Sequence, residues 1–181
     1  MKTKSILVVL FSTVLFLSCK NDKTESAKEE SGKVGIESGF KVTLNVIVKQ
    51  DDDFSLFFTE DGSIDFKGTP IWMGVKGSPN IQQVVYTLPT EVFPTELRLD
   101  FGMKQNQEDI ILQSIIFEYK DNKKEIIGAA LKNLFRADEN KCTFDANTGV
   151  IKAITKDGVR QYPSLYPIEA SLKLELEKLG K

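Results

Sequence analysis

Residues 40–48 read FKVTLNVIV, with apolar Phe40, Val42, Leu44 and Val46 alternating with polar neighbours. Alternation with a period of two places the apolar side chains on one face of an extended strand, whereas a helix repeats every 3.6 residues. The sequence ELRLDF at residues 96–101 has the same pattern. Both stretches predict β-strands with one face in a core and the other in water.

Turn residues separate several further stretches of this kind. Asp51-Asp52-Asp53 ends the first strand, and Glu60-Asp61-Gly62-Ser63 has turn chemistry, with Gly62 suited to a positive φ. The residues that we predict as strands are 40–48, 54–58, 71–76, 81–88, 96–101, 109–119, 142–145 and 150–154, followed by an extended segment at 162–168. Many short strands between turns are typical of an all-β fold, and we expect a jelly-roll-like antiparallel β-sandwich with one or two short peripheral helices.

Three local features refine this prediction. The apolar phase shifts near Ser114-Ile115, which predicts a bulge, and Gly149 lies where residues 142–154 would turn back as a hairpin. Residues 126–136, IIGAALKNLFR, have helical apolar spacing and predict a short helix. Residues 169–179 fit a strand through Leu172, Leu174 and Leu176, or a helix through Leu172, Leu176 and Leu179. Their good helix formers favour the helix.

Bulk composition excludes some classes of function. The chain has 181 residues, of which 41% are hydrophobic, so one domain can bury a core without disulfides. The net charge of −2 leaves no basic surface typical of nucleic-acid binding, and we expect no nucleic-acid partner. The chain contains no histidine, which excludes His-dependent triads and His metal sites.

The N-terminus has the layout of a secretory signal. Lys2 and Lys4 precede an apolar run from Ile6 to Leu17, and Ser18 is a small residue at the expected cleavage position. The run is shorter than the ~20 apolar residues that a membrane-spanning helix needs. We therefore predict a signal peptide at residues 1–18.

A cysteine follows this signal directly, in Phe16-Leu17-Ser18-Cys19. The stretch resembles a bacterial lipobox of the looser kind found in Bacteroidetes, with Phe16 where leucine is usual. The resemblance implies that Cys19 is the first mature residue and carries the lipid, so that the protein is anchored in the cell envelope, in the outer membrane. The stretch Lys20-Asn21-Asp22-Lys23 partly resembles a surface-export signal, which implies display at the cell surface.

We predict that residues 19–38 form a flexible tether, because their Lys, Glu, Ser and Gly content cannot bury enough apolar surface to fold alone, and the lipobox resemblance implies that the tether is lipidated at Cys19. The folded domain is expected at residues 39–181. Lipidation of Cys19 leaves Cys142 without an intramolecular partner, and we expect Cys142 to be a small buried hydrophobic residue.

The strand order suggests a family at the level of fold. The stretches DDDFSLFF, GVKGSPNIQQVVYTLP, TELRLDFG and IILQSIIFEY, within residues 40–119, resemble a jelly-roll domain like those of carbohydrate-binding modules. The resemblance implies a β-sandwich and, by analogy alone, binding of polysaccharide. The matched residues are Asp52, Asp53, Phe54, Leu56, Gln83, Val85, Leu88, Pro89, Leu97, Arg98, Leu99, Asp100 and Gly102.

Four residues are candidates for ligand binding. Trp72, the single tryptophan, shares the more polar face of its strand with Gly74 and Lys76, so it can be a stacking platform, with core packing as the alternative. Tyr86 is a second candidate and shares its face with apolar neighbours. Arg98 and Asp100 lie on one face of the fifth strand and can pair with each other or with a neighbouring residue.

Asp61, Ser63 and Asp65 have the spacing of a fragment of a calcium loop, with solvated turn residues as the alternative, so a structural calcium is the one cofactor considered. No acid lies in an apolar sequence frame that would raise its pKa, although two acids could meet at the separation of a glycoside hydrolase. We therefore expect a non-catalytic protein that binds glycan or another envelope component. The alternatives are an accessory subunit of an envelope complex and, third, a glycoside hydrolase.

Overall fold

The computed structural model describes residues 39–181. The predicted signal peptide, residues 1–18, and the predicted tether, residues 19–38 with Cys19, lie outside the described residues. Within residues 39–181, no helix is long and apolar enough to cross a membrane.

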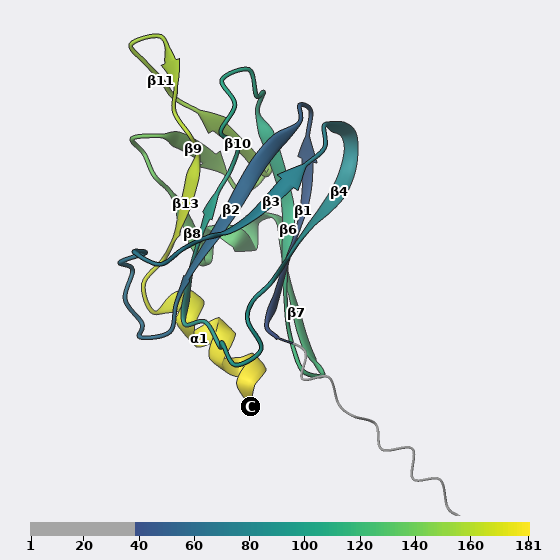
Figure 1. Ribbon diagram of the computed structural model, residues 1–181, viewed down its shortest axis with the longest axis vertical. Helices are drawn as coiled ribbons and strands as arrows, with labels where there is room; N and C mark the ends of the chain where they lie inside the picture. Colours follow the sequence, from purple (N-terminus) through teal and green to yellow (C-terminus); the bar gives the residue numbers. More distant parts are fainter. Residues whose placement is uncertain (1–38) are drawn as a thin grey trace, which may run out of the picture. The chain divides into compact units, whose positions relative to one another are not determined.

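Two antiparallel sheets pack face to face (Figure 1). The first sheet has the strand order β4-β1-β6-β10-β9, with β7 also paired to β6, and the second has the order β3-β2-β5-β13-β8. The strands of the first sheet are β1 (Lys41–Val48), β4 (Ser78–Thr87), β6 (Ile110–Tyr119), β7 (Asn122–Ile127), β9 (Cys142–Asp145) and β10 (Val150–Ala153). The strands of the second sheet are β2 (Asp52–Thr59), β3 (Ile71–Val75), β5 (Glu96–Asp100), β8 (Phe135–Ala137) and β13 (Ser164–Pro167).

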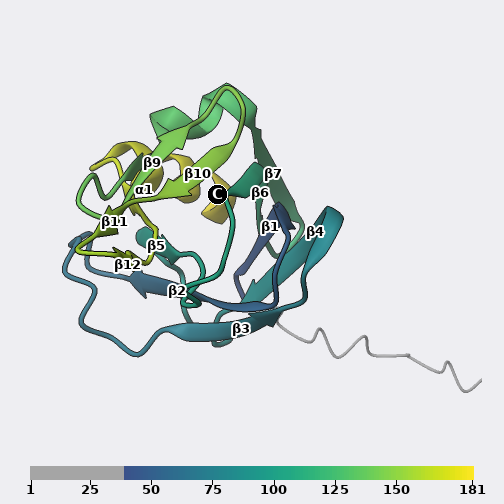
Figure 2. The same ribbon diagram turned by 90° about the horizontal axis from the view of Figure 1, so that it is seen from above.

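The all-β sandwich predicted from the sequence is confirmed. The chain crosses from one sheet to the other between β1 and β2, between β3 and β4, and at both ends of β5, which is a jelly-roll-like connectivity. A small hairpin of β11 (Thr155–Lys156) and β12 (Val159–Arg160) projects at one end of the sandwich (Figures 1 and 2). The helical elements are short: η1 (Gly128–Asn133), α1 (Ser171–Glu177) and η2 (Lys178–Gly180).

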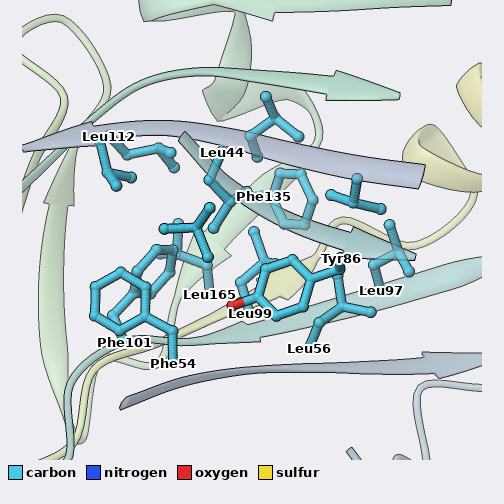
Figure 3. Packing of buried hydrophobic residues seen from close by; sticks show 14 of the residues in the cluster. Leu44, Phe54, Leu56, Tyr86, Leu97, Leu99, Phe101, Leu112, Phe135 and Leu165 are labelled. Carbon is cyan, nitrogen blue, oxygen red and sulfur yellow. The ribbon is translucent and has the colours of Figure 1, made fainter. Parts of the chain in front are cut away.

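The inner faces of the two sheets form one hydrophobic core (Figure 3). Leu44 and Tyr86 from the first sheet and Leu56, Leu97 and Leu99 from the second are all essentially inaccessible to water. Burying an apolar side chain of this size contributes about 1.5–3 kcal/mol each. The alternation seen in the sequence therefore selects the residues that hold the sheets together.

The predicted bulge and hairpin are confirmed. Pairing of β6 with β1 shifts between Ser114 and Leu112, which leaves Gln113 as the extra residue, next to the predicted position. Gly149 turns the chain between β9 and β10 with φ +76°, and a Cβ atom there would lie 2.4 Å from the carbonyl oxygen of Leu112. No other residue type fits at Gly149 without moving β6.

The helix predicted at residues 126–136 is mostly wrong. Ile126 and Ile127 end β7, which pairs with β6 along its full length, and Phe135 begins β8. Only Gly128–Asn133 coils, as the 3₁₀ helix η1, after Gly128 takes φ +53°. Local helical spacing was outweighed by the hydrogen bonds that each end makes with a neighbouring strand.

The helix predicted at residues 169–179 is confirmed as α1 followed by η2. Leu172, Leu176 and Leu179 are buried, whereas 58% of Leu174 is exposed. This is the helical pattern and not the alternating one. α1 packs against the end of the sandwich opposite the β11–β12 hairpin (Figure 1).

Candidate functional site

The outer face of the second sheet carries two rows of side chains that run across its strands. We call the first of them the upper row; it consists of Trp72 of β3, Ser55 of β2, Asp100 of β5 and Ser164 of β13. Each of these residues is paired in register with the next one across the sheet. Residues opposite one another in a sheet share a face, so these four side chains lie side by side. The predicted candidates Trp72 and Asp100 are therefore brought to the same row.

The lower row is packed and closed. The Arg98 guanidinium lies over the Phe57 ring, 4.3 Å from its centroid, and 5.2 Å from the centroid of Tyr166. The Arg136 guanidinium also lies over the Tyr166 ring, 5.5 Å from its centroid. Phe66 packs edge-on against Tyr166, with the two ring centroids 6.0 Å apart. Phe66 belongs to the β2–β3 connection, which thus covers this row. In the upper row Trp72 is exposed, whereas Ser55 and Ser164 are buried.

Arg98 and Asp100 form a bidentate ion pair between the two rows. Arg98 Nε donates to Asp100 Oδ1 at 2.8 Å, and Nη2 donates to Oδ2 at 2.5 Å. These hydrogen bonds raise the pKa of Arg98 above its ordinary value. The pairing predicted from the shared strand face is confirmed, and it occupies both oxygens of Asp100.

A small hollow opens beside the upper row, and we call it the Trp72 notch. It has a volume of about 70 Å³ and is lined by Asp53, Trp72, Asp100, Phe101, Gly102, Met103 and Tyr162. Trp72 is 49% exposed, and Met103 and Tyr162 are each 44% exposed. Three large apolar side chains from separate parts of the chain thus meet at one shallow site, where carboxylates also lie.

Buried hydrogen bonds hold Met103 at the notch. The buried Asp52 accepts at Oδ1 from the backbone N–H groups of Met103 (2.7 Å) and Lys104 (3.1 Å), and at Oδ2 from Gln107 Nε2 (3.0 Å). Gly102 has φ +68°, and a Cβ atom there would lie 2.7 Å from Asp52 Oδ2. The carboxylate of Asp52 therefore fixes the loop that presents Met103.

Tyr162 reaches the notch from the segment before β13. The backbone N–H of Phe101 donates to the Pro163 carbonyl at 2.8 Å, which extends the pairing of β5 with β13. Arg160 Nη1 donates to the Gly102 carbonyl at 3.1 Å. These contacts bring Tyr162 beside the loop that follows β5.

Two polar groups on this face have no protein partner among the described residues. Ser55 Oγ is buried without a hydrogen bond, although Ser55 lies between Trp72 and Asp100 in the upper row. The exposed Asp53 carboxylate forms no ion pair within residues 39–181, and a Cβ atom on Gly74 would lie 3.6 Å from its Oδ1. Of the two groups, only the exposed Asp53 carboxylate is within reach of water or a ligand.

Tyr86 is a correction to the predicted candidates. It points inward from β4 with Val84 and Leu88 and has no exposed surface, so it lies away from any surface ligand. Burial raises the pKa of Tyr86 above its ordinary value, and its hydroxyl has no hydrogen-bond partner in the described part of the chain. The apolar residues that share its strand face draw it into the core.

The residues of the predicted calcium loop make local contacts. Asp61 Oδ1 accepts from the Ser63 backbone N–H at 2.9 Å, which lowers the pKa of Asp61, and Asp65 pairs with Lys67. Residues 39–181 hold no group of three or more His, Cys, Asp or Glu side chains arranged for a metal ion. The geometry thus adds no support to a calcium site at Asp61, Ser63 and Asp65.

A larger open groove, of about 820 Å³, lies between β8 and β9, the edge strands of the two sheets. Cys142 lies at its floor, fully buried, and its Sγ donates to the Ser164 carbonyl at 3.4 Å. Burial raises the pKa of the Cys142 thiol, as expected for the buried hydrophobic residue predicted from the sequence. Charged side chains rim the groove: Lys132, Arg136, Asp138 and Glu139.

Sequence reasoning did not single out Met103 or Tyr162. Both lie outside the alternating strands, and their positions depend on the Asp52 hydrogen bonds and on the pairing of Phe101 with Pro163. The one local signal was Tyr162 itself, an aromatic residue directly before a proline in an extended segment.

Comparison with known proteins gives no match to this chain among family models, curated proteins or solved structures.

Proposed function

We propose that this protein is a lipid-anchored envelope protein whose β-sandwich binds glycan at the Trp72 notch and catalyses no reaction. The observation that carries the proposal is the convergence of Trp72, Met103 and Tyr162, all strongly exposed, on one shallow site with Asp53 and Asp100. Large apolar side chains that gather at the surface beside polar groups are typical of binding sites.

The chemistry of the notch suits a sugar. The C–H face of a pyranose ring is apolar and flat, so it can cover an aromatic ring and remove both surfaces from water. Carboxylate oxygens accept hydrogen bonds from sugar hydroxyls. A hollow of about 70 Å³ is too small to enclose a ligand, which favours stacking on an open chain.

The state of Asp100 supports binding without catalysis. A glycoside hydrolase needs two carboxyl groups, one of which is protonated to act as the general acid. Arg98 donates to both oxygens of Asp100, so both oxygens already accept a hydrogen bond from a fixed guanidinium. This arrangement favours Asp100 as a fixed acceptor.

The envelope location is proposed from the sequence around Cys19. Incorporation of labelled palmitate that is lost in Cys19→Ser would support the anchor. An unlabelled wild-type protein would contradict it.

Retention on polysaccharide gels tests the proposed binding. The full chain should be retarded by at least one insoluble or gel-embedded polysaccharide, and Trp72→Ala should lose most of that retardation because the stacking surface is gone. Ile81→Ala is the matched control, since Ile81 is 53% exposed but lies on β4 of the first sheet. Equal behaviour of Trp72→Ala and wild type on every gel would contradict the proposal.

The second candidate function is that of an accessory subunit, and the groove between β8 and β9 favours it. Edge strands with unpaired backbone groups accept an extended segment of another protein, and the charged rim would fix its register. Crosslinking in intact cells tests this candidate. Stable co-purification with one protein partner that is lost in Arg136→Glu would favour it over glycan binding.

A further inference from the structure

The charges at the Trp72 notch do not cancel. Arg98 compensates Asp100, but Asp53 has no ion pair within residues 39–181. An uncompensated carboxylate favours a cation and disfavours an anion, and because Asp53 is exposed this effect is screened by salt.

The basic residues around the notch are engaged elsewhere. Lys76 pairs with Asp51 at 2.8 Å, and Lys49 pairs with Glu108 at 2.7 Å. Arg160 donates to the carbonyl oxygens of Gly102 (3.1 Å) and Lys104 (3.5 Å), and burial lowers its pKa. Lys104, which follows Met103, is the exception, because its ammonium forms no ion pair within residues 39–181. Asp53 likewise has no ion pair there, so its carboxylate at the notch is open to a cation.

Ser55 lies in the same row but is closed off from a ligand. Its side chain is only 1% exposed, and its register places it between Trp72 and Asp100. The residues that line the notch include Asp53 and not Ser55. The polar contact that the notch offers to a ligand is therefore the Asp53 carboxylate.

We infer that the Trp72 notch selects glycans that carry a free amine, such as glucosamine units, over neutral sugars and over uronic acids. The inference rests on the proposed glycan binding. An ammonium group at C2 of a stacked sugar can pair with Asp53 while its charge lies near the Trp72 and Tyr162 rings. A uronate carboxylate at the same place is repelled by Asp53.

Three hexasaccharides with the same β-1,4-linked glucose backbone separate charge from stacking. Cellohexaose carries a hydroxyl at C2, chitohexaose an acetamide, and hexaglucosamine a free amine. Titration calorimetry on the full chain at about pH 6, where an amine is protonated, should give roughly fivefold tighter binding of hexaglucosamine than of cellohexaose. The preference should shrink at about 0.5 M salt, where the screening length is only a few ångströms.

Asp53→Asn keeps the shape of the side chain and removes its charge, so the affinity ratio of hexaglucosamine to cellohexaose should fall to about one. Asp51→Asn is the matched control, because Asp51 is two residues away, exposed and already paired with Lys76. This control should keep the ratio of the wild type. Equal loss of the ratio in both variants would assign the preference to general surface charge and overturn the inference.

The outcomes separate the inference from the function on which it rests. Equal binding of all three hexasaccharides, weakened by Trp72→Ala, overturns the amine preference and leaves glycan binding in place. Absence of binding to all three and to the polysaccharide gels overturns both. Tighter binding of a lysine hexapeptide than of hexaglucosamine also overturns the inference, since a protein segment would then be the better ligand.

Discussion

Asp52 connects the fold to the notch through a single carboxylate. It is 3% exposed and accepts hydrogen bonds from the backbone of Met103 and Lys104 and from the side chain of Gln107. A carboxylate that accepts several N–H groups holds a loop more firmly than neutral turns do. The shape of the notch therefore depends on a residue that no ligand would touch.

Asp52→Ala should lower the free energy of unfolding by about 2 kcal/mol, because it removes the buried acceptor of Gln107 and the part-buried acceptor of the Met103 and Lys104 N–H groups. Urea denaturation of the variant measures this loss. Asp51→Ala serves as the control and should change stability by less than about 1 kcal/mol, since its pair with Lys76 is exposed. A loss as small as that of the control would contradict the role assigned to Asp52.

Trp72 and Tyr86 show what alternation can predict about single residues. Trp72 was assigned to the more polar face of its strand, and it is exposed. Tyr86 shares a strand face with Val84 and Leu88, and it is buried with them. Period-two alternation correctly separates the two faces of a strand, but only the packing of the sheets determines which face a ligand can reach.

Among the elements, α1 and the following η2 show how a short helical segment is fixed by three leucines. Leu172, Leu176 and Leu179 face the core, and Leu174 faces water. Leu176→Ala should lower the free energy of unfolding by about 3 kcal/mol, the usual cost of truncating a buried leucine. Leu174→Ala should stay within about 0.5 kcal/mol of the wild type. Denaturation curves of equal midpoint for both variants would contradict the packing of α1.

The contact between β5 and the start of α1 predicts a pH dependence. Glu96 of β5 is buried, and burial raises the pKa of its carboxyl to about 7 from the ordinary 4.5, so the expectation that no acid has a raised pKa is wrong. The groups that face it are the backbone N–H of Ala170, the ammonium of Lys173 and the carboxylate of Glu169. The hydrogen bond and Lys173 oppose the rise, whereas Glu169 adds to it.

A raised carboxyl pKa means that the folded protein binds more protons than the unfolded chain between pH 4.5 and about 7. The free energy of unfolding should therefore fall as pH rises through this window. Glu96→Gln removes the titrating group, so its stability relative to the wild type should increase with pH across the window. Glu91→Gln, an exposed control, should follow the wild type. Parallel curves for Glu96→Gln and the wild type would rule out the burial effect.

β7 and β8 show which elements the sequence could not predict. In β7, NKKEII, four of the six residues are charged or polar and exposed before Ile126 turns inward, so no alternation marks a strand. β8 has three residues, too few for any periodicity. β7 forms as a hairpin on β6, the strand directly before it, and β8 forms on β13, which lies much later in the sequence. Pairing with a partner strand, and not the local pattern, therefore determines both strands.

For the whole molecule, the long strands could be predicted and the convergence of loops could not. β1, β5 and β6 are visible in the sequence because each has one buried face. The Trp72 notch combines β3, the loop after β5 and the segment before β13, and it exists only once the second sheet has formed. Sequence reasoning therefore found Trp72 and Asp100 but not Met103 or Tyr162.

The most direct test of glycan binding at the notch uses the fluorescence of Trp72, the single tryptophan of the chain. Trp72 is 49% exposed, so its emission reports directly on whatever covers its ring. Titration of the full chain with cellohexaose, chitohexaose and hexaglucosamine should shift the emission to shorter wavelength in a saturable way for at least one of them. Unchanged emission through saturating concentrations of all three, together with retention on a polysaccharide gel that survives Trp72→Ala, would contradict binding at this site.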